Sequence, residues 1–487
     1  MLSSITALVT LMAMAIVVTA QGSCGGIIGN GTFYTVKYYD TFTVVTSKDP
    51  YRPDINPEDY LLYCGLEDPN PPEFASIRSR FQIPLLRVAV GQNATGSFLE
   101  LLGQREKIVR ISKPDGLISP CLQALTKNQT IGVFDNADPN AYIGIDGAFV
   151  DRQHTSQDKD IWIPNAEVDP IERLAFIKPV SLFFGQGQRG EDVFSKIKTG
   201  YEDIRDTAKQ IDQSHKKRIG WVQYDSGSGR WELVNTLFVR TIIRDAGGVS
   251  FPLSGGLDQE TIHLQPQEMK DLVRNSHIII DQSDINAFPS IPSRFQSWLR
   301  LAGFASNEDT LVLSDHQVYS LDSTRNFRGS TDYFYRPAVR PDLLLRDLIR
   351  AQYSNYNPKV NYTMTFLNRG FSYEAKAATV LTEADCDKPV YNDEPIVPFV
   401  DPIFTGDGRV TAPPTGSGPY GGGSPSNQGG SGSGGGSSKT GIIVAVVVVA
   451  VLVGAGFAFA FFKWSKRAKE DRFIELEEEM NNEIPLH

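Results

Sequence analysis

The sequence predicts an α/β protein with two Rossmann-like lobes joined by a long backbone helix, plus one C-terminal transmembrane helix. Strand-like and helix-like segments alternate over most of the first 400 residues, which is typical of α/β folds. A helical periodicity of apolar residues, beginning near Glu191, separates an earlier group of these segments from a later one. Residues 441–462 are apolar and uncharged, and that stretch is long enough to cross about 30 Å of hydrocarbon.

Length and composition limit the class of protein. A chain of 487 residues is too long for one ordinary core, so we expect more than one lobe. With 41% hydrophobic and 21% charged residues, the composition is that of a globular protein. The formal net charge of −10 argues against a nucleic-acid partner, because a DNA- or RNA-binding surface needs a cationic excess.

The first lobe is predicted from a hairpin and a strand–helix–strand unit. Residues 32–47 are rich in Thr, Tyr, Val and Phe and predict a β-hairpin. A buried strand at 83–90, a glycine-containing turn, a short helix and a strand at 107–112 together predict a βαβ unit, and therefore a parallel sheet. Weaker strands are expected at 147–151 and 160–164.

A pair of helices is predicted to connect the lobes. Asp169 and Pro170 are residues that open a helix, and Pro179 should kink that helix because it lacks a backbone N–H. After a glycine-rich break, the long helix should begin near Glu191. Its apolar residues recur three and four apart: Val193, Phe194, Ile197, Tyr201, Ile204, Ala208 and Ile211.

The second lobe repeats the alternation. Residues 218–224 predict a strand, 225–230 a polar loop, and 231–248 a helix closed by paired glycines. Further elements are expected as strands at 277–281, 310–315 and 317–321 and a helix at 340–353. Two such lobes leave a cleft between them, which is the usual place for a ligand.

The N-terminal 20 residues predict a signal peptide. They are apolar, and Val18 and Ala20 are small residues at the positions that signal peptidase requires before Gln21. The alternative is an N-terminal membrane anchor, but this stretch lacks a second flank of charge.

The C-terminal region predicts a membrane tether. Residues 405–440 are rich in Gly, Ser and Pro and predict a flexible linker. Four Lys or Arg residues lie within 463–469 after the apolar segment, against Lys439 alone before it, so the tail 463–487 should be cytosolic. We therefore expect a single-pass type I protein of the plasma membrane with an extracellular N-terminal domain.

Cysteines and glycosylation sequons agree with an exported domain. The four cysteines, an even number, predict two disulfides, with three pairings open: Cys24, Cys64, Cys121 and Cys386. Four Asn-X-Thr sequons could accept glycans: Asn30, Asn93, Asn128 and Asn361.

Several stretches, in order, resemble the helical-backbone (class III) substrate-binding proteins of ABC importers, which serve ferric siderophores, cobalamin, haem and metal ions. The stretches are "YTVKYYDTFTVVTSKDPY" with "YLLYCG", "IPLLRVAVGQNATGSFLELLGQREKIVRIS", "DPIERLAFIKPVSLFFGQGQRGEDVFSKIKTGYEDI", "KRIGWVQYDSGSGRWELVNTLFVRTIIRDAGG" and "VRPDLLLRDLIRA". The resemblance covers about residues 30–400. The chain departs from the family at Gly91–Thr95, where a Ser-Thr run is common, and at Pro179. A membrane-anchored, eukaryotic form of the family is expected from the tether, the sequons and the cysteines.

Together these patterns predict seven segments. They are a signal peptide (1–20), an N-terminal lobe with its hairpin (21–185), a linking helix (186–215), a C-terminal lobe (216–404), a linker (405–440), a transmembrane helix (441–462) and a cytosolic tail (463–487).

The resemblance implies ligand contacts from loops at the carboxyl ends of strands that face the cleft. Three groups of residues are candidates. The first is the turn with Gln92 and Asn93, whose helix start could hold an anion. The second is Tyr224, Asp225, Arg230 and Trp231, and the third is Arg325, Arg328, Tyr333, Tyr335 and Arg336, in which arginines could clamp acidic groups and aromatic rings could stack on a flat chelate. An ordinary turn and two solvated loops are the alternatives.

Neither metal ligation nor catalysis is indicated. His154, His215, His263, His277 and His316 are scattered without ligand-like spacing, so no bound metal or cofactor is expected. The sequence contains no GxSxG, P-loop, HExxH or nucleotide fingerprint.

The leading hypothesis is a cell-surface protein that captures a metal chelate, of the ferric siderophore, haem or cobalamin type, for uptake through a transporter or endocytic partner. The alternative is a sensing or adhesion ectodomain on the same fold.

Overall fold

The computed structural model describes residues 25–52, 57–151, 157–164, 167–209, 215–251, 261–284, 293–305, 308, 310–314, 317–353, 363–369, 377–386, 403–404 and 410–411. The predicted signal peptide, transmembrane helix and cytosolic tail lie outside these residues, as do Cys24, His154, His316 and Asn361. None of the helices in the described ranges has both the length and the apolar composition needed to cross a membrane.

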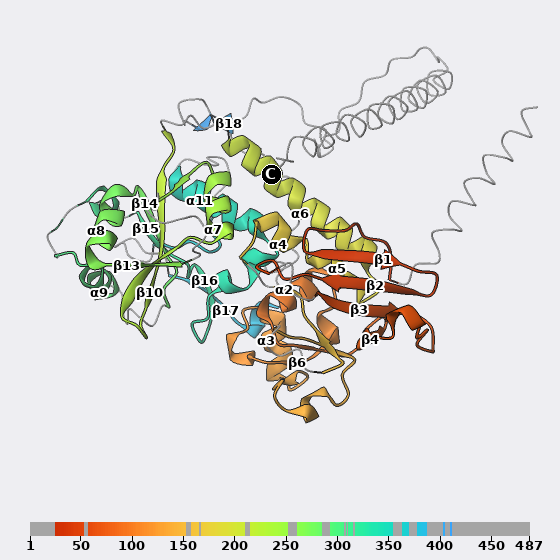
Figure 1. Ribbon diagram of the computed structural model, residues 1–487. Helices are drawn as coiled ribbons and strands as arrows, with labels where there is room; N and C mark the ends of the chain where they lie inside the picture. The colour runs from red at the N-terminus through yellow and green to blue at the C-terminus, as the bar shows by residue number, and fades with distance from the viewer. Residues whose placement is uncertain are drawn as a thin grey trace, which may run out of the picture. The chain divides into compact units, whose positions relative to one another are not determined.

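The N-terminal lobe, predicted at 21–185 and called lobe 1 below, contains two sheets and the helices around them (Figure 1). The hairpin predicted at 32–47 forms and belongs to a four-stranded sheet in the order β1-β2-β3-β4. The second sheet is five-stranded and entirely parallel, in the order β7-β6-β5-β8-β9. The strands are β1 (Tyr34–Tyr38), β2 (Phe42–Ser47), β3 (Glu58–Tyr63), β4 (Ser79–Gln82), β5 (Val88–Val90), β6 (Ile108–Ile111), β7 (Gly132–Val133), β8 (Gly147–Phe149) and β9 (Asp160–Ile161).

The predicted βαβ unit is present as β5, α2 (Asn93–Leu101) and β6. Its first strand is shorter than predicted, and α2 begins at Asn93, within the stretch expected to be a turn. A second helix, α3 (Pro120–Lys127), starts at a proline, with the Ser119 hydroxyl accepting from Leu122 N. This helix was not predicted, because its eight residues show little apolar periodicity.

Pro179 divides the predicted connecting helix into α4 (Pro170–Leu174) and α5 (Ile177–Leu182). Asp169 caps α4 by accepting from Ile171 N, as expected. Because Pro179 has no N–H to donate to Ala175 O, that carbonyl accepts from Lys178 N instead, and the break falls one turn before the proline.

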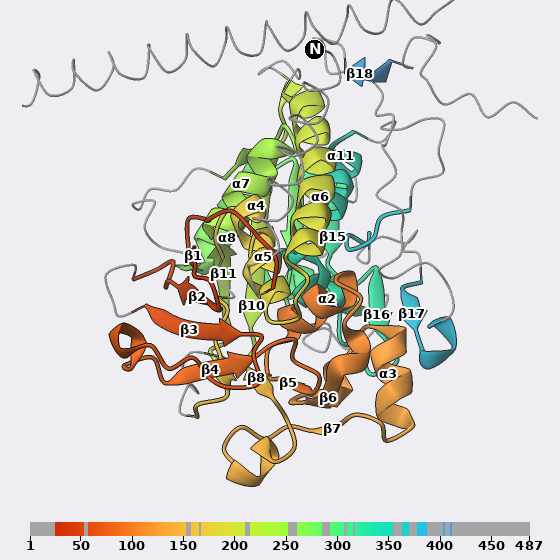
Figure 2. The ribbon, with the colours of Figure 1, turned by 90° about the vertical axis from the view of Figure 1, so that its right-hand side faces the viewer.

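The long helix α6 (Gly187–Ala208) joins the cores of both lobes, and it begins a few residues earlier than predicted. Val193 and Ile197, in its first half, are buried among lobe 1 residues. Tyr201, Ile204 and Ala208, in its second half, are buried in the core of the C-terminal lobe. One amphipathic stripe therefore contributes to two cores, which makes the helix a common element of both lobes. Figure 2 shows the ribbon of α6 beside that of α11 (Pro341–Gln352).

The C-terminal lobe, predicted at 216–404 and called lobe 2 below, is built on a six-stranded mixed sheet. Its main order is β13-β11-β10-β14-β15, with β12 beside the start of β10, and β10, β14 and β15 are parallel. The strands are β10 (Arg218–Asp225), β11 (Arg230–Val234), β12 (Val249–Ser250), β13 (Thr261–Leu264), β14 (Ile278–Asp281) and β15 (Val318–Ser320). The helices are α7 (Leu237–Asp245), α8 (Pro266–Asn275), α9 (Ser293–Leu301), α10 (Leu311–Ser314) and α11 (Pro341–Gln352).

Two predictions in lobe 2 were wrong. The segment 231–248 is not one helix, because 231–234 form β11 and pair antiparallel with β10, so "DSGSGR" is a hairpin turn. Residues 311–314, expected in a strand, form α10. A short apolar run does not distinguish a strand from a buried helical turn, and tertiary packing decided both cases.

The last described segments return to elements far away in sequence. The Asp347 carboxylate of α11 accepts from the backbone N–H groups of Thr365, Phe366 and Leu367, which holds 363–369 against lobe 2. The short strand β17 (Thr379–Leu381) pairs with β16 (Thr324–Asn326). Inside the predicted linker, β19 (Val410–Thr411) pairs with β18 (Ile403–Phe404); the remainder of the linker lies outside the described residues.

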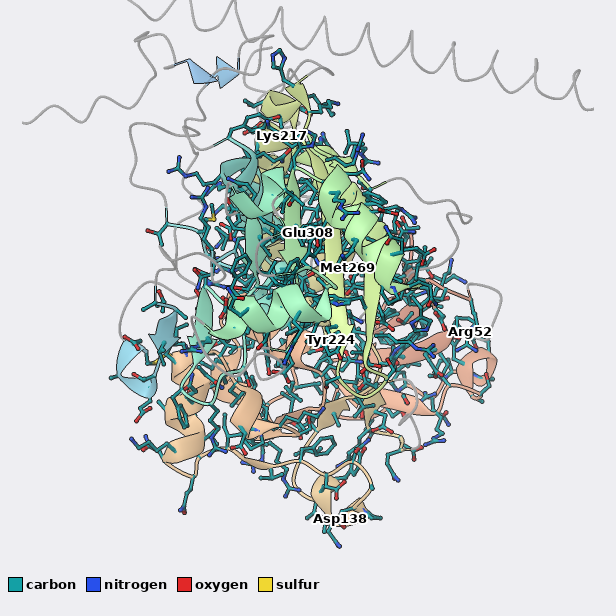
Figure 3. The ribbon with its side chains drawn as sticks, turned by 90° about the vertical axis from the view of Figure 1, so that its left-hand side faces the viewer. Arg52, Asp138, Lys217, Tyr224, Met269 and Glu308 are labelled. Carbon is teal, nitrogen blue, oxygen red and sulfur yellow. A yellow bond between two sulfur atoms is a disulfide. The ribbon has the colours of Figure 1, made fainter. Side chains whose placement is uncertain are left out.

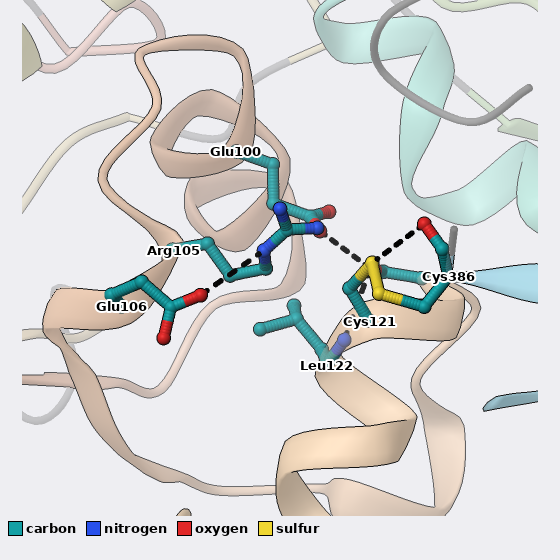
Figure 4. The surroundings of a disulfide bond; sticks show 7 residues. Glu100, Arg105, Glu106, Cys121, Leu122 and Cys386 are labelled. Atoms are coloured by element: carbon teal, nitrogen blue, oxygen red, sulfur yellow. Dashed lines mark hydrogen bonds and ion pairs between the residues drawn. A yellow bond between two sulfur atoms is a disulfide. The ribbon is translucent and has the colours of Figure 1, made fainter. Parts of the chain in front are cut away.

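Cys121 of α3 is disulfide-bonded to Cys386 (Figure 4), a pairing that the sequence left open. Cys64 is also in a disulfide. The Cys121–Cys386 bond joins lobe 1 to the segment that carries β17, across 265 residues of sequence.

Candidate ligand-binding site

A cavity of about 440 Å³ lies at the carboxyl ends of β14 and β15. Parallel strands end at the same edge of a sheet, so the residues that follow them converge there. A volume of this size is within the range of small-molecule sites. The cavity, called the pocket below, is lined by Gln282, Ser283, Asp284, Arg294, Leu321, Asp322, Arg328, Gly329, Ser330, Thr331, Phe334 and Tyr335.

The floor of the pocket contains a buried ion pair. Arg294, at the start of α9, donates from Nη1 to Asp322 Oδ2 at 3.1 Å, and both side chains are almost fully buried. Asp322 also accepts a hydrogen bond from the Ser320 hydroxyl at its other carboxylate oxygen. The arginine is therefore held in one position, with its guanidinium at the pocket.

A second buried carboxylate, Asp281, lies beside this pair at the end of β14. Its Oδ1 accepts from Ser283 N at 2.9 Å and from the Ser283 hydroxyl at 2.5 Å. Burial raises the pKa of Asp281 to about 6, although Ser283, Arg294 and Trp298 each act to lower it. The charge behind the pocket floor therefore depends on the protonation state of Asp281.

One wall of the pocket, residues 328–335, connects it to lobe 1. Asn326 organises the turn that precedes this wall, because its Oδ1 accepts from Arg328 N at 2.9 Å and from Ser330 N at 3.0 Å. Its Nδ2 donates to the carbonyls of Asp115 and Leu117 in lobe 1, at 2.9 and 3.0 Å. Arg328 forms an ion pair with Asp115 at 2.5 Å. The pocket wall is therefore built against both lobes.

Tyr335 separates the pocket from a smaller cavity in lobe 1. The small cavity measures about 20 Å³ and is lined by Tyr335 together with residues of α2 and α3, including Glu100. Burial raises the pKa of Tyr335 to about 12. A Cβ added at Gly116 would lie 2.5 Å from the Tyr335 hydroxyl oxygen, so a larger residue at this position would require the tyrosine side chain to shift.

Only two of the five residues in the third predicted group line the pocket. Arg328 and Tyr335 line the pocket. Arg336 is instead buried in an ion pair with Asp332, with Nε donating to Asp332 Oδ2 at 2.7 Å. Tyr333 packs against Trp221 in lobe 2, and Arg325 lies on β16 opposite Val380. These three are not among the lining residues.

The second predicted group lies on the β10–β11 hairpin. Trp231 is a core residue: its Nε1 donates to Leu301 O at 2.9 Å, and its ring packs against Trp298. Tyr224 packs on Trp231 from the neighbouring strand, near the end of β10 opposite to Lys217 (Figure 3). Asp225 accepts from the turn amides of Gly227 and Ser228, and hydrogen bonding to Ser228 lowers its pKa. Of this group only Arg230 is left exposed.

The first predicted group lines neither of these two cavities. The Gln92 side chain is buried, and its Nε2 donates to Val150 O at 2.8 Å, which ties the start of α2 to the end of β8. Asn93 is the first residue of α2, followed by the buried Ala94 and Thr95. Both ends of the Gln92 side-chain amide therefore form hydrogen bonds within lobe 1, to Val150 and Thr95.

Positive charge in and around the pocket is balanced by negative charge. Arg294, Arg328 and Arg336 each pair with an aspartate. No group of three or more His, Cys, Asp or Glu side chains within the described ranges is arranged to hold a metal ion. The pocket therefore offers both signs of charge and several hydrogen-bonding groups, rather than one cationic surface.

The sequence patterns did not identify most of the residues that line the pocket. Gln282, Ser283 and Asp284 directly follow the buried strand "HIIID", and polar residues at that place are the expected signal of a site in a parallel sheet. Arg294 and Asp322 carried no comparable local signal, because they come from separate elements that only the fold brings together.

No protein-family model matches the chain, and no curated protein matches it. Solved structures that resemble it include bacterial binding proteins. A periplasmic binding protein from Veillonella parvula is 16% identical; the match covers 64% of this chain and 98% of that one, with a TM-score of 0.45. The petrobactin-binding protein of Bacillus subtilis is 13% identical over 63% of this chain and 98% of its own, with a TM-score of 0.44. A periplasmic haem-binding protein from Pseudomonas aeruginosa is 13% identical over 61% and 99%, with a TM-score of 0.42. All three TM-scores lie below 0.5.

Proposed function

We propose that this protein is a cell-surface substrate-binding protein that captures a metal chelate, of the ferric siderophore, haem or cobalamin type, for uptake. The observation that carries the proposal is the pocket of about 440 Å³ at the carboxyl ends of two parallel strands of lobe 2, closed by a wall that is attached to lobe 1. Sites of this kind, at the strand ends of open α/β sheets, are where such folds bind ligands.

The lining indicates what kind of ligand fits. Arg294 and Arg328 present cationic groups, Asp284 and Asp322 present anionic ones, and each arginine is held by an aspartate. Phe334 and Tyr335 add aromatic surface. A ligand with a flat or apolar body and several oxygen atoms at its edge would use all of these groups, and metal chelates have that composition.

Ligand binding can be tested by titrating the purified full-length protein with a ferric siderophore, haem or cobalamin, followed by intrinsic tryptophan fluorescence. We expect binding of at least one of them at micromolar concentration. Ser330→Trp would fill the pocket from its wall and should weaken binding at least about 30-fold, equivalent to about 2 kcal/mol. Because the new tryptophan changes the fluorescence, the affinity of this variant is measured by calorimetry.

Arg230→Ala serves as the control, because Arg230 is exposed on the hairpin and does not line the pocket. Its affinity should equal that of the unmodified protein. Loss of binding in Arg230→Ala with retention in Ser330→Trp would move the site to the hairpin. Absence of binding for every chelate would instead favour the sensing or adhesion hypothesis.

The proposal includes membrane anchoring through residues 441–462, with the lobes outside the cell and a transporter or endocytic protein as the partner that receives the ligand. The full-length protein should stay in the membrane pellet after alkaline washing, whereas a chain ending at residue 440 should be secreted. Recovery of the full-length protein in the soluble fraction would contradict the anchor.

Glycan mapping tests the extracellular location independently. Asn30 and Asn128 are exposed and should carry glycans. Thr95, the third residue of the Asn93 sequon, is 1% exposed, with its hydroxyl donating to Gln92 Oε1. A chain that folds as described should therefore leave Asn93 unmodified. Unmodified Asn30 and Asn128 would count against passage through the secretory pathway.

A further inference from the structure

Residues 377–386 lie between the strand that precedes the pocket wall and helix α3 of lobe 1. This segment, called the strap, carries β17 and a short 3-10 helix, Glu383–Asp385. In both ribbon views β17 lies near β16 and α3 (Figures 1 and 2). The strap thus connects the strand that leads into the pocket wall with a helix of lobe 1.

On one side the strap supports the wall. Strand β17 runs parallel to β16, with Asn326 opposite Leu381. Asn326 is the residue whose side chain organises the turn of the wall. The Leu381 side chain is buried in a small cluster with Ile118 and Tyr335, away from the main cores of the lobes. The strap therefore contacts the wall at its start and beneath the tyrosine that lines the pocket.

On the other side the strap is attached to α3. Cys386 is bonded to Cys121, Glu383 forms an ion pair with Lys127, and Gln123 Nε2 donates to Leu381 O at 3.4 Å. The ion pair is largely exposed and contributes little. The β16–β17 ladder has three residues in each strand, too few for independent stability. The covalent bond is therefore the strongest attachment of the strap.

From this connectivity we propose that the strap positions the pocket wall 328–335, and that the Cys121–Cys386 disulfide locks the strap in place. In a chain that lacks this bond, Leu381 is no longer held against Tyr335 and β16 is loosened, so that the wall moves while both lobes stay folded. The inference goes beyond the proposed function, because it concerns the position of the wall and holds whichever ligand the pocket accepts.

Hydrogen exchange of the full-length protein, followed by mass spectrometry, tests the proposal without any ligand. In the Cys121→Ala/Cys386→Ala variant, amide exchange should rise at least about tenfold in 324–331 and 379–385. These stretches include Thr379 N, which donates to Ser323 O, and Ser330 N, which donates to the Asn326 side chain. Exchange in β5 and β14, which are interior strands of the two sheets, should not change.

A pair of single substitutions in β17 provides a matched comparison that keeps the disulfide. Leu381→Ala removes the buried contact with Tyr335 and should raise exchange in 328–335. Val380→Ala changes the neighbouring residue, which is 41% exposed, and should leave that exchange unchanged. Unchanged exchange of the wall in the disulfide-free variant would overturn the proposal. A uniform rise in both lobes would also overturn it, because the disulfide would then stabilise the whole fold and not the wall.

Discussion

Replacing Arg294 by methionine is expected to lower the free energy of unfolding by about 3–5 kcal/mol, the usual cost of removing one partner of a buried ion pair. The guanidinium contacts Asp322 at 3.1 Å, and both residues are almost inaccessible to solvent. It also lies near Asp281, whose pKa it lowers. Without it, two carboxylates remain buried at the pocket floor with no cation in this position.

The measurement is urea-induced unfolding of the purified full-length protein, with Arg300→Met as the matched control. Arg300 is in the same helix but is exposed, so its replacement should change stability by less than about 0.5 kcal/mol. The double variant Arg294→Met/Asp322→Asn should be more stable than Arg294→Met alone, because one of the unpaired charges is gone. A loss below about 1 kcal/mol for Arg294→Met would mean that the pair is not buried as described.

Replacing Asp281 by asparagine is expected to change how the stability of the protein depends on pH. The pKa of this carboxyl is about 6 in the folded protein because of burial, above its ordinary value of 3.8. The folded protein therefore holds this proton more tightly than the unfolded chain does. Above about pH 6 the ionised buried carboxylate costs up to about 3 kcal/mol, and that cost is relieved as the pH falls from about 6 to about 4.

The asparagine variant lacks this titration. Its stability relative to the unmodified protein should therefore be greater at pH 7.5 than at pH 4.5, by about 2 kcal/mol, because pH 4.5 still lies above the ordinary pKa of 3.8 and part of the cost remains there. Comparing two pH values cancels the pH-independent effects of the substitution on hydrogen bonding to Ser283. Asp284→Asn removes an exposed carboxyl nearby but retains Asp281, so the pH dependence that comes from Asp281 should remain. An equal difference at both pH values for Asp281→Asn would show that the carboxyl does not titrate in this range.

Titration of Asp281 also bears on the pocket. Its ionised form adds a negative charge beside the Arg294–Asp322 pair, so protonation should favour anionic ligands and disfavour cationic ones. Groups that face this carboxyl come from the loop after β14, through Ser283, and from α9, through Arg294 and Trp298. The direction in which ligand affinity changes between pH 7.5 and 5.5 would therefore report the charge of the ligand.

Long periodic segments were predicted well from the sequence. The stripe of α6 was identified because its apolar residues recur over more than four turns, and the hairpin β1–β2 because of its β-branched and aromatic residues. Two short elements of lobe 2 were not. The helix α10 and the strand β11 were assigned to the wrong class, since a four- or five-residue apolar run satisfies both patterns.

The candidate site was predicted only in part. Two members of the third group, Arg328 and Tyr335, line the pocket. Trp231 and Arg336 looked equally suitable as residue types, yet the former is a core residue and the latter is paired with Asp332. Residue type shows what a side chain could bind, whereas its neighbours decide whether it is free to do so.

What the sequence alone determined about this protein is therefore local: two successive α/β regions, the helix between them, and the apolar segment 441–462 that predicts a membrane tether. Each depends on a repeat or a composition within one stretch of chain. The tertiary structure alone decided the pairing of Cys121 with Cys386, the strap beside the wall, and the meeting of Arg294 with Asp322. Those contacts join residues 28 to 265 positions apart, and their energies depend on burial and distance, which no local pattern encodes.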